Sequence, residues 1–448
     1  KNIEKLTQGT YLKLSMIDDS WSHNNLSLNQ YWKMEDIAKS GNQENKYSDS
    51  EDNAIEELEK LLSKSVKRQM ISDVSLGAFL SGGIDSSLIV ALMQKQSNKK
   101  VKTFTIGFNE DGVNEADEAI QIAKYLDTDH TELYVNPEDA MNVINKLPKI
   151  YDEPFADSSQ IPTFLVSQLA REHVTVSLSG DGGDEMFGGY TRYFMANRVW
   201  KNIHKIPLPF RKIISKVISF FSPSFWNYFF NNMFKILPSQ YRVTHPADKL
   251  YKLSKILISK DIYEVYDNLV SHWSNPFEVV LNSNNAIQKQ KNYQFLDHEN
   301  EMMLRDSNTY LPDDILVKVD RAAMSVSLET RTPFLDKNVV EFAWQLPLNM
   351  KIKNSQGKWI LRKVLDKYIP KELIDRPKMG FGVPIDLWLR GPLKEWAEEL
   401  LSEKRLEHDG YFNVQIIRTK WLEHLSGNQN WQYHLWNVLM FQIWLDEQ

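Results

Sequence analysis

The amino-acid sequence predicts a doubly wound parallel α/β sheet followed by a mainly helical C-terminal part. In the first half of the chain, short apolar segments typical of buried strands alternate with segments of helical periodicity. Beyond Tyr190 the strand signals largely stop, and helical patterns continue to the end. This alternation favours a parallel sheet with helices on both faces. A chain of 448 residues is also too long for one ordinary core, so we expect at least two domains.

The N-terminal segment differs from the sheet that follows it. Residues 1–36 contain strand-like alternation at 9–14, and residues 37–50 are polar and rich in turn formers, which predicts a linker. From residue 51 to 71, apolar residues recur at helical spacing. The main domain is therefore expected to begin at residue 51.

The expected α/β core covers residues 51–190, and the mainly helical part covers 191–448. The expected strands of the core are 74–80, 101–108, 130–135 and 174–178. The expected helices between them are 88–93, 115–126, 137–147 and 161–171. In such a sheet, the loops that follow the strands meet at one edge, where ligands bind.

The composition excludes several classes of protein. The formal charge of −6 gives no support for a nucleic-acid polymer as partner. Without cysteine, the chain has no disulfide, no cysteine metal site and no thiol nucleophile, which fits a reducing compartment such as the cytoplasm. The ten histidines show no ligand spacing, so we expect no metal other than Mg²⁺. No apolar stretch reaches the roughly 18 residues of a membrane span.

A glycine-rich loop, Ser81-Gly82-Gly83-Ile84-Asp85-Ser86-Ser87, lies between the first expected strand and a helix. Glycines let an anion approach the backbone closely, and the N–H groups at a helix start hold it. The three serines add hydroxyl donors, but Asp85 suits a phosphate site only if Mg²⁺ lies between its carboxylate and the phosphates. The loop therefore predicts a site for phosphates and Mg²⁺. It lacks the Gly-Lys-Ser/Thr spacing of Walker ATPases.

A second loop, Ser179–Tyr190, follows the last expected strand and contains five glycines and three acids in twelve residues. Core packing does not explain this composition. One interpretation is a calcium-type turn or a flexible loop. The other is a tight loop that presents Asp181 and Asp184 to a metal or a reacting group at the same sheet edge as the first loop.

A third loop, Arg376–Pro384, contains Lys378 and two glycines. The first loop resembles the PP-loop of ATP pyrophosphatases, which cleave ATP between the α and β phosphates. With the Glu329–Asp336 stretch in the same order, the three loops resemble the synthetase domain of glutamine-hydrolysing asparagine synthetases over about residues 50–390. The resemblance implies a sheet of the PP-loop, or adenine nucleotide α-hydrolase, type.

The activity that this resemblance implies is that of an AMP-forming ligase. In that family the domain adenylates the side-chain carboxylate of aspartate with ATP and releases pyrophosphate, and ammonia then displaces AMP to give asparagine. The implied ATP-binding positions are Leu80, Ser81, Gly82, Gly83, Asp85, Ser86, Ile106, Ser179 and Gly180.

The metal and catalytic positions follow from the same resemblance. Asp85 and Asp184 would bind Mg²⁺, and Lys378 would neutralise the charge that develops during adenylation. Asp181 lies where well-studied members have Glu, the suspected base for the attacking ammonia, and its shorter side chain has less reach. The intact acids and the lysine argue against the alternative of a catalytically dead nucleotide-binding regulatory module.

The acceptor site departs from the family pattern. Some members bind aspartate with a Thr and an Arg before the fourth strand, whereas residues 153–160 of this chain contain no Arg. Either another cation, such as Arg331 or Arg321, holds the substrate carboxylate, or the acceptor is not aspartate. The alternatives are another carboxylate, such as a sugar uronic acid, and an intramolecular cyclisation. Arg331 is explained equally well as a structural partner of Glu329.

The front half of the usual family architecture is missing from this chain. Family members begin with a glutaminase domain, which has an N-terminal cysteine nucleophile and supplies ammonia from glutamine. Residues 1–36 resemble only the last strands of that domain, and the chain begins at Lys1 and has no cysteine. We therefore expect that truncation or processing removed the domain. We also expect the chain to use ammonia without hydrolysing glutamine.

Residues 186–247 contain nine Lys or Arg and no acid, and aromatic residues cluster between 220 and 234. One interpretation is that the aromatic residues form the core of the helical part and that the basic residues are its solvated rim. The other is a docking face for an anionic membrane or partner, which would be a peripheral membrane contact.

Overall fold

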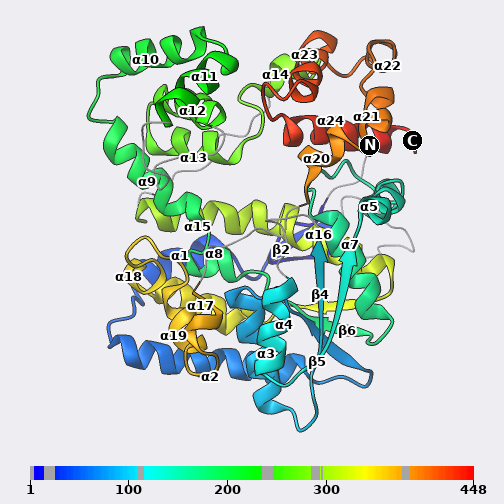
Figure 1. The fold of residues 1–448 in the computed structure, drawn as a ribbon. Coiled ribbons are helices and arrows are strands. Elements are labelled where there is room, and N and C mark those ends of the chain that lie inside the picture. Colours follow the sequence, from blue (N-terminus) through cyan, green and yellow to red (C-terminus); the bar gives the residue numbers. More distant parts are fainter. Residues whose placement is uncertain are drawn as a thin grey trace.

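The computed structural model describes residues 5–14, 26–108, 116–234, 246–283, 293, 296–375 and 383–448. It confirms the predicted fold class, because a parallel sheet is flanked by helices and followed by a mainly helical part (Figure 1). The strands of the sheet are β3 (Leu76–Phe79), β4 (Lys102–Phe108), β5 (Asp129–Val135), β6 (Val176–Leu178) and β7 (Glu329–Arg331).

The order of the strands creates a crevice beside β3. The sheet runs β5-β4-β3-β6-β7, and all neighbours are parallel. Ala78 of β3 pairs with Thr103 on one side and with Leu178 on the other. The chain leaves β3 towards β4 and β5, then crosses over to β6 on the opposite side. The connections after β3 and β6 therefore diverge at the carboxyl edge, which is the usual ligand position in such sheets.

Each face of the sheet is covered by a separate hydrophobic core. One core joins the strands to α2 (Glu51–Gln69), α3 (Ile84–Gln96) and α4 (Ala116–Tyr125). The other contains Phe104, Ile106 and Phe108, which alternate along β4, with α5 (Pro137–Ile144), α6 (Leu147–Tyr151) and α7 (Gln160–Arg171). The last helices of the chain pack into this second core. Helices on both faces hold the strands rigidly and fix the loops at their ends.

Helix α2 shows why the predicted helices form where they do. The Ser50 hydroxyl accepts a hydrogen bond from the Asn53 N–H at 3.2 Å and caps the first turn. Acids in the first turn and bases in the last turn match the helix dipole. Its buried face consists of Ala54, Ile55, Leu58, Leu62, Ser65 and Val66.

The remaining helices build the C-terminal part and the loops around the sheet. They are α8 (Gly183–Phe187), α9 (Thr191–Ile203), α10 (Leu208–Phe220), α11 (Pro223–Phe234), α12 (Pro246–Leu257), α13 (Ile262–Val270), α14 (Pro276–Val279), α15 (His298–Asn308), α16 (Leu316–Ser325), α17 (Lys337–Gln345), α18 (Leu348–Lys351), α19 (Trp359–Leu365), α20 (Ile385–Arg390), α21 (Lys394–Leu400), α22 (Glu403–Asp409), α23 (Val414–Leu425) and α24 (Gln432–Leu445). A π-helical turn covers Leu311–Ile315, and 3₁₀ turns cover Pro333–Leu335 and Lys371–Leu373. No helix in this described part of the chain is both long and apolar enough to cross a membrane.

The prediction of a linker at residues 37–50 was wrong for residues 37–43, which belong to a helix. Helix α1 (Met34–Gln43) packs on α17, and the Trp344 indole N–H lies 3.1 Å from the Met34 sulfur. A Cβ at Gly41 would lie 2.7 Å from the Trp344 carbonyl oxygen. The polar, glycine-containing composition that suggested a linker instead allows this close approach.

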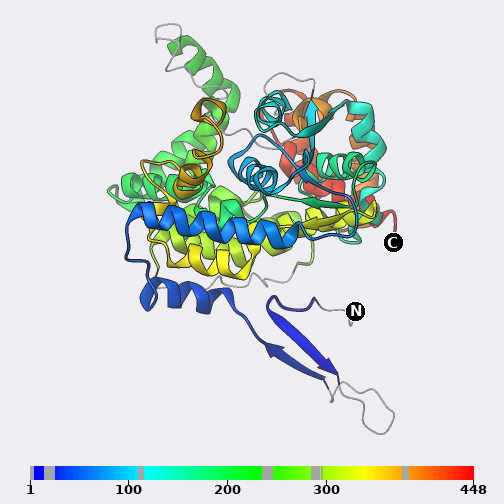
Figure 2. The same cartoon turned by 90° about the horizontal axis from the view of Figure 1, so that it is seen from below.

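Strand β7 was not predicted, because it is short and carries charged residues at both ends. It extends the sheet beyond β6 and comes from the segment for which we expected helices. The α/β layer therefore does not end at residue 190. Near the N-terminus, β1 (Thr10–Leu14) and β2 (Leu26–Gln30) form an exposed antiparallel hairpin that extends from the body (Figure 2).

A buried lysine makes the stability of this fold depend on pH. Lys351 is 1% exposed, and its Nζ donates to Oδ1 of Asn300 at 3.4 Å. Burial lowers the pKa of Lys351 to about 7, against the attraction of Asp297. Between pH 7 and the ordinary lysine pKa of 10.5, the unfolded chain therefore binds a proton that the folded chain does not. Stability from this residue must rise with pH across that window.

We predict that Lys351→Met flattens this dependence. In denaturant titrations between about pH 7.5 and 9.5, the unfolding free energy of the variant should rise less steeply than that of the parent chain. The expected difference is up to about 1.4 kcal/mol per pH unit. The matched control is Lys39→Met at an exposed position, which should keep the parent slope. Equal slopes for Lys351→Met and the parent would show that the lysine is charged in the folded state.

Candidate active site

Two glycine-rich loops meet at the carboxyl edge of the sheet, where β3 and β6 are neighbours. Both line one cavity of about 700 Å³, together with side chains from β4, α7, α16 and the segment before α19. The structure thus brings together all nine positions predicted for ATP. The cavity lining includes Leu80, Ser81, Gly82, Gly83, Asp85, Ser86, Ile106, Ser179 and Gly180.

The first loop is held open by its own hydroxyl groups. Ser86 Oγ accepts from the Ser81 N–H at 3.2 Å and lies 3.1 Å from Ser81 Oγ. Gly82 has φ +75°, a conformation that costs a side-chain-bearing residue energy. Gly83 is the N-cap of α3 and has no side chain to fill the helix start. The loop therefore places the first turn of α3 and the hydroxyl groups of Ser81 and Ser86 at the cavity, as an anion site requires.

The second loop packs directly against the first. A Cβ at Gly180 would lie 2.8 Å from the Ser86 nitrogen, and a Cβ at Gly183 would lie 2.6 Å from the Asp85 carboxyl carbon. Side chains at these positions would separate the loops. The close contact between the two loops therefore explains Gly180 and Gly183, which core packing did not explain.

The centre of the site is the ammonium group of Lys358. Its Nζ lies 2.8 Å from Oδ1 of Asp184 and also contacts Oδ2 of Asp85. Burial disfavours the charged form, but the Asp184 and Asp85 carboxylates outweigh it and raise the pKa of Lys358. The lysine therefore stays protonated and holds the two acids of the two loops together.

Lys358 occupies a position that breaks several local rules. It has φ +58°, is buried, and is the N-cap of α19, where a cation opposes the helix dipole. Such costs persist only where the surroundings impose them, often at functional sites. This residue was not predicted from the sequence. The available signal was a Gly-Lys pair, Gly357-Lys358, directly before the segment that forms α19.

The same two carboxylates fit a magnesium ion. Asp85 and Asp184 each direct a carboxylate oxygen at the Lys358 ammonium. The position of this ammonium is therefore one where the two carboxylates stabilise a positive charge. Mg²⁺ typically uses one or two carboxylates and completes its shell with phosphate oxygens and water. Among the described residues there is no cluster of three or more His, Cys, Asp or Glu, so phosphates would have to supply further ligands.

Two further acids of the second loop have raised pKa values. Burial raises the pKa of Asp181, although the Ser179 hydroxyl donates to its Oδ2. Burial and the charge of Asp184 raise the pKa of Glu185 to about 7, and the Tyr190 hydroxyl donates to Glu185 at 2.7 Å. Of the two, Asp181 is the acid that faces the far half of the cavity, where Lys318 lies.

The far half of the cavity contains a second lysine. Lys318 Nζ donates to Oδ2 of Asp157 at 2.7 Å and to Oγ of Ser159 at 2.8 Å. Although burial opposes the charge, Lys318 lowers the pKa of Asp157 to about 2. Burial and the Asp157 charge raise the pKa of Asp314, in the π-helical turn before α16, to about 7. Neither Lys318 nor Asp314 was predicted as a site residue.

The arginines expected to hold the acceptor lie elsewhere. Arg331 donates to Glu329 at 2.7 Å and to the carbonyl oxygens of Gln69 and Ile71 at 2.6 and 2.8 Å. It therefore fastens β7 to the end of α2, which supports the structural interpretation. Arg321 is exposed and pairs with the adjacent Asp320. Neither arginine lines the cavity, which leaves another cation or another acceptor among the alternatives. Lys378 lies outside the described residues.

We predict that Lys358→Ala destabilises the chain and that Mg²⁺ restores part of the loss. Removing the ammonium leaves two carboxylates facing each other, which should cost about 3 kcal/mol. A divalent cation at the same point would relieve the repulsion. The measurement is the melting temperature with and without Mg²⁺.

The control for this experiment is Lys363→Ala on the same helix. Lys363 is more exposed and lies 3.8 Å from Asp366, so its loss should cost less than about 1 kcal/mol. It should show no response to Mg²⁺. A loss in Lys358→Ala that Mg²⁺ leaves unchanged would contradict a cation site between Asp85 and Asp184.

Comparisons with known proteins agree with this arrangement. The sequence profile of the family described as "Asparagine synthase" matches residues 57–446. The chain is 32% identical over 405 residues to asparagine synthetase [glutamine-hydrolyzing] 1 of Bacillus subtilis, covering 88% of this chain and 59% of that protein. It is 32% identical over 407 residues to a putative asparagine synthetase of Mycobacterium tuberculosis, covering 89% and 58%.

A third relative matches over a shorter range. This is a putative asparagine synthetase of Methanocaldococcus jannaschii, 46% identical over 164 residues, which cover 36% of this chain and 32% of that protein. The chain thus spans a little under three fifths of the B. subtilis and M. tuberculosis relatives. The family profile, however, extends across both cores and all described site residues. The chain belongs to the asparagine synthase family.

Proposed function

We propose that this chain is an ATP-dependent amide-forming ligase that adenylates a carboxylate, releases pyrophosphate and transfers ammonia to the acyl group. The observation that carries the proposal is the Lys358 ammonium between Asp85 and Asp184, beside an open cradle of N–H and hydroxyl donors. This arrangement suits a polyphosphate that lies between fixed cations. The family membership supports the same class of reaction.

The cavity offers separate places for the two parts of ATP. The phosphates would lie over Ser81–Ser86, where the first loop presents its donors. The nucleoside would lie along Leu80, Ile106 and Gly180, which line the cavity at the sheet edge. Asp85 and Asp184 would hold Mg²⁺, which when bound would neutralise phosphate charge.

In the first step, an oxygen of the acceptor carboxylate attacks the α-phosphorus of ATP. The bond from that phosphorus to the bridging oxygen of the β-phosphate breaks, and pyrophosphate leaves with both bonding electrons. Negative charge accumulates on the leaving group, and Lys358, Arg362 and Lys378 are the cations that we assign to its stabilisation. The first two line the cavity; the third is assigned from the family resemblance.

In the second step, ammonia attacks the acyl carbon of the adenylate and AMP leaves. The nitrogen must lose a proton, and Asp181 is the acid that we assign as its acceptor. A raised pKa makes this carboxylate a better base, and the Ser179 hydroxyl orients it. Glutamine is the proposed source of this ammonia, since the relatives from B. subtilis and M. tuberculosis are named as glutamine-hydrolysing enzymes.

The acceptor is proposed as aspartate, with a uronic acid as the second candidate. Lys318 is the cation in the far half of the described cavity lining, and Asp157 already pairs with it. A second acceptor carboxylate, such as the α-carboxylate of aspartate, would have to share this lysine. Hydroxyl groups of Ser158, Ser159 and Tyr310 line the same region and suit a hydroxylated acceptor.

ATP–pyrophosphate exchange across a panel of carboxylates tests the proposal. Aspartate, glutamate and glucuronate are each incubated with the chain, ATP, Mg²⁺ and labelled pyrophosphate. Exchange that depends on one carboxylate supports adenylation and identifies the acceptor class. ATP binding without exchange for any carboxylate would favour the regulatory module instead.

We predict that substitutions of two acids in the second loop affect adenylation and amide formation differently. Asp181→Asn should keep pyrophosphate exchange, because it removes only the proton acceptor, and should slow amide formation by roughly 10²–10³-fold. Asp184→Asn, three residues away, should lose both activities through weaker Mg²⁺ binding. Unchanged amide formation by Asp181→Asn would exclude Asp181 as the base.

We predict that Lys378→Ala slows adenylation by roughly 10²–10³-fold, the usual cost of losing one oriented electrostatic stabiliser. The ATP dissociation constant should change far less, because the charge on the leaving group develops mainly during the reaction. Exchange rates and ATP titrations measure the two effects. Lys371→Ala, a nearby surface lysine 3.5 Å from Asp366, is the control. Equal exchange rates for both variants would make Lys378 an ordinary loop cation.

A further inference from the structure

Helices α10 and α11 carry an apolar face that nothing in the described chain covers. On α10 the exposed apolar residues recur at helical spacing, and Phe210 and Phe220 are 61% and 82% exposed. The residues of this surface, which we name the α10–α11 face, are Phe210, Ile213, Ile214, Val217, Phe220, Phe225, Tyr228 and Phe229. Single exposed apolar residues are normal, but a continuous face of this kind marks an interaction site.

The exposure is not the result of a poorly anchored helix. The opposite side of α10 is buried through Arg211 and Ile218 and packs on α12. Arg211 donates to the carbonyl oxygens of Ile206 at 3.0 Å, Leu257 at 3.2 Å and Ser259 at 2.7 Å. The helix is therefore fixed with one side in the protein and the other side towards solvent.

Some aromatic residues between 220 and 234 are packed and others are exposed, so each of the two interpretations from the sequence applies to part of the cluster. Trp226 and Phe230 are half-buried, and the Trp226 indole N–H donates to the Ile218 carbonyl at 2.9 Å. These residues belong to the packing between α10 and α11. Tyr228 is 72% exposed, and Phe225 stacks on Phe221, with ring centroids 4.5 Å apart, but remains 41% exposed.

The charge around this face has one sign. Residues 186–247 contain no acid, although the whole chain has a formal charge of −6. Lys212 and Lys216 lie one turn apart on the flank of α10, and both are exposed. An apolar face with a basic border complements an anionic lipid surface, since apolar side chains enter the interface and lysines meet the head groups.

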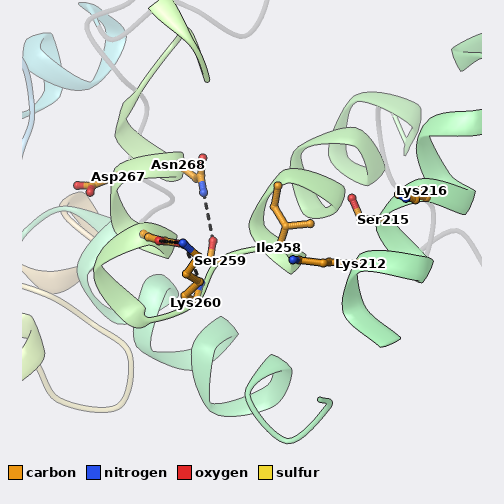
Figure 3. A pocket seen from close by; sticks show the side chains of 9 residues that line it. Lys212, Ser215, Lys216, Ile258, Ser259, Lys260, Asp267 and Asn268 are labelled. Atoms are coloured by element: carbon orange, nitrogen blue, oxygen red, sulfur yellow. Dashed lines mark hydrogen bonds and ion pairs between the residues drawn. The ribbon is translucent and has the colours of Figure 1, made fainter. Parts of the chain in front are cut away.

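A pocket beside the face collects part of this charge. Figure 3 shows Lys212 and Lys216 of α10 across from Lys260, and the pocket has a volume of about 640 Å³. Two acids also line it, but Glu264 accepts from the Lys260 N–H at 2.7 Å, and Asp267 lies 3.9 Å from Arg305. The volume of the pocket therefore admits a lipid phosphate, and the three lysines supply positive charge to bind it.

We propose that the α10–α11 face docks on an anionic lipid bilayer, with the lysine pocket beside it at the level of the head groups. None of the residues of the active-site cavity lies in α10 or α11, so this contact is separate from the proposed chemistry. In Figure 2 the face lies on the side of the molecule away from the β1–β2 hairpin. The proposed contact is peripheral, because neither helix is long and apolar enough to cross a membrane.

Vesicle co-sedimentation of the full chain tests this proposal. The probes are vesicles of phosphatidylcholine alone and of phosphatidylcholine mixed with phosphatidylglycerol, at low and at high salt. We expect binding to the anionic vesicles that weakens as salt increases, because the lysines contribute through screened attraction. We expect little binding to the neutral vesicles.

Two double variants assign the binding to this face. Lys212→Gln/Lys216→Gln should weaken anionic binding roughly thirty-fold, at about fivefold for each lysine. Phe210→Ser/Phe220→Ser should weaken it by at least about tenfold, even at low salt. Matched controls are Lys60→Gln/Lys64→Gln, an exposed pair also four residues apart on α2, and Leu387→Ser/Leu422→Ser at exposed apolar positions. Melting temperatures and pyrophosphate exchange should be unchanged in all four.

Three results would overturn the proposal. The first is no binding to anionic vesicles. The second is equal loss of binding in the face variants and their controls, which would indicate a general charge effect. The third is sedimentation-equilibrium evidence that the chain self-associates through Phe210 and Phe220, so that a second copy covers the face.

Discussion

The Lys358 ammonium between the carboxylates of Asp85 and Asp184 is the interaction on which the described site depends. Asp85 belongs to the loop after β3 and Asp184 to the loop after β6, while Lys358 arrives from the N-terminus of α19, far along the chain. Two half-buried acids at this separation would repel each other without a cation. Three segments distant in sequence are therefore held at one point by charge, and that point borders the phosphate cradle.

The sheet provides the geometry that this interaction needs. Because β3 and β6 are neighbours while their connections diverge, the two loops leave the same edge and enclose a crevice. Glycines at 180 and 183 let the backbones approach until Asp85 and Asp184 share one cation. The separate cores on the two faces fix the strands, so the spacing of the carboxylates is set by the rigid part of the molecule.

The parts of the structure that could be predicted from sequence are those with local signals. Buried strands such as β4 and amphipathic helices such as α2 follow from periodicity, and the acids of the two glycine loops follow from composition. Strand β7 and helix α1 were not predicted, because tertiary packing and not the local sequence pattern determines their structure. Lys318 lies within a helix and Lys358 directly before one, and neither was predicted, because only carboxylate partners from distant segments make each lysine a site residue.

The central claim is that an acceptor carboxylate attacks the α-phosphorus of ATP in this crevice. The most direct measurement uses aspartate, or the acceptor found by exchange, labelled with ¹⁸O in the reacting carboxylate, together with ATP, Mg²⁺ and ammonium. Attack at the α-phosphorus transfers one carboxylate oxygen to the nucleotide, so mass spectrometry should find one ¹⁸O in AMP and none in pyrophosphate. Label in inorganic phosphate, with ADP as the nucleotide product, would show attack at the γ-phosphorus and contradict the account.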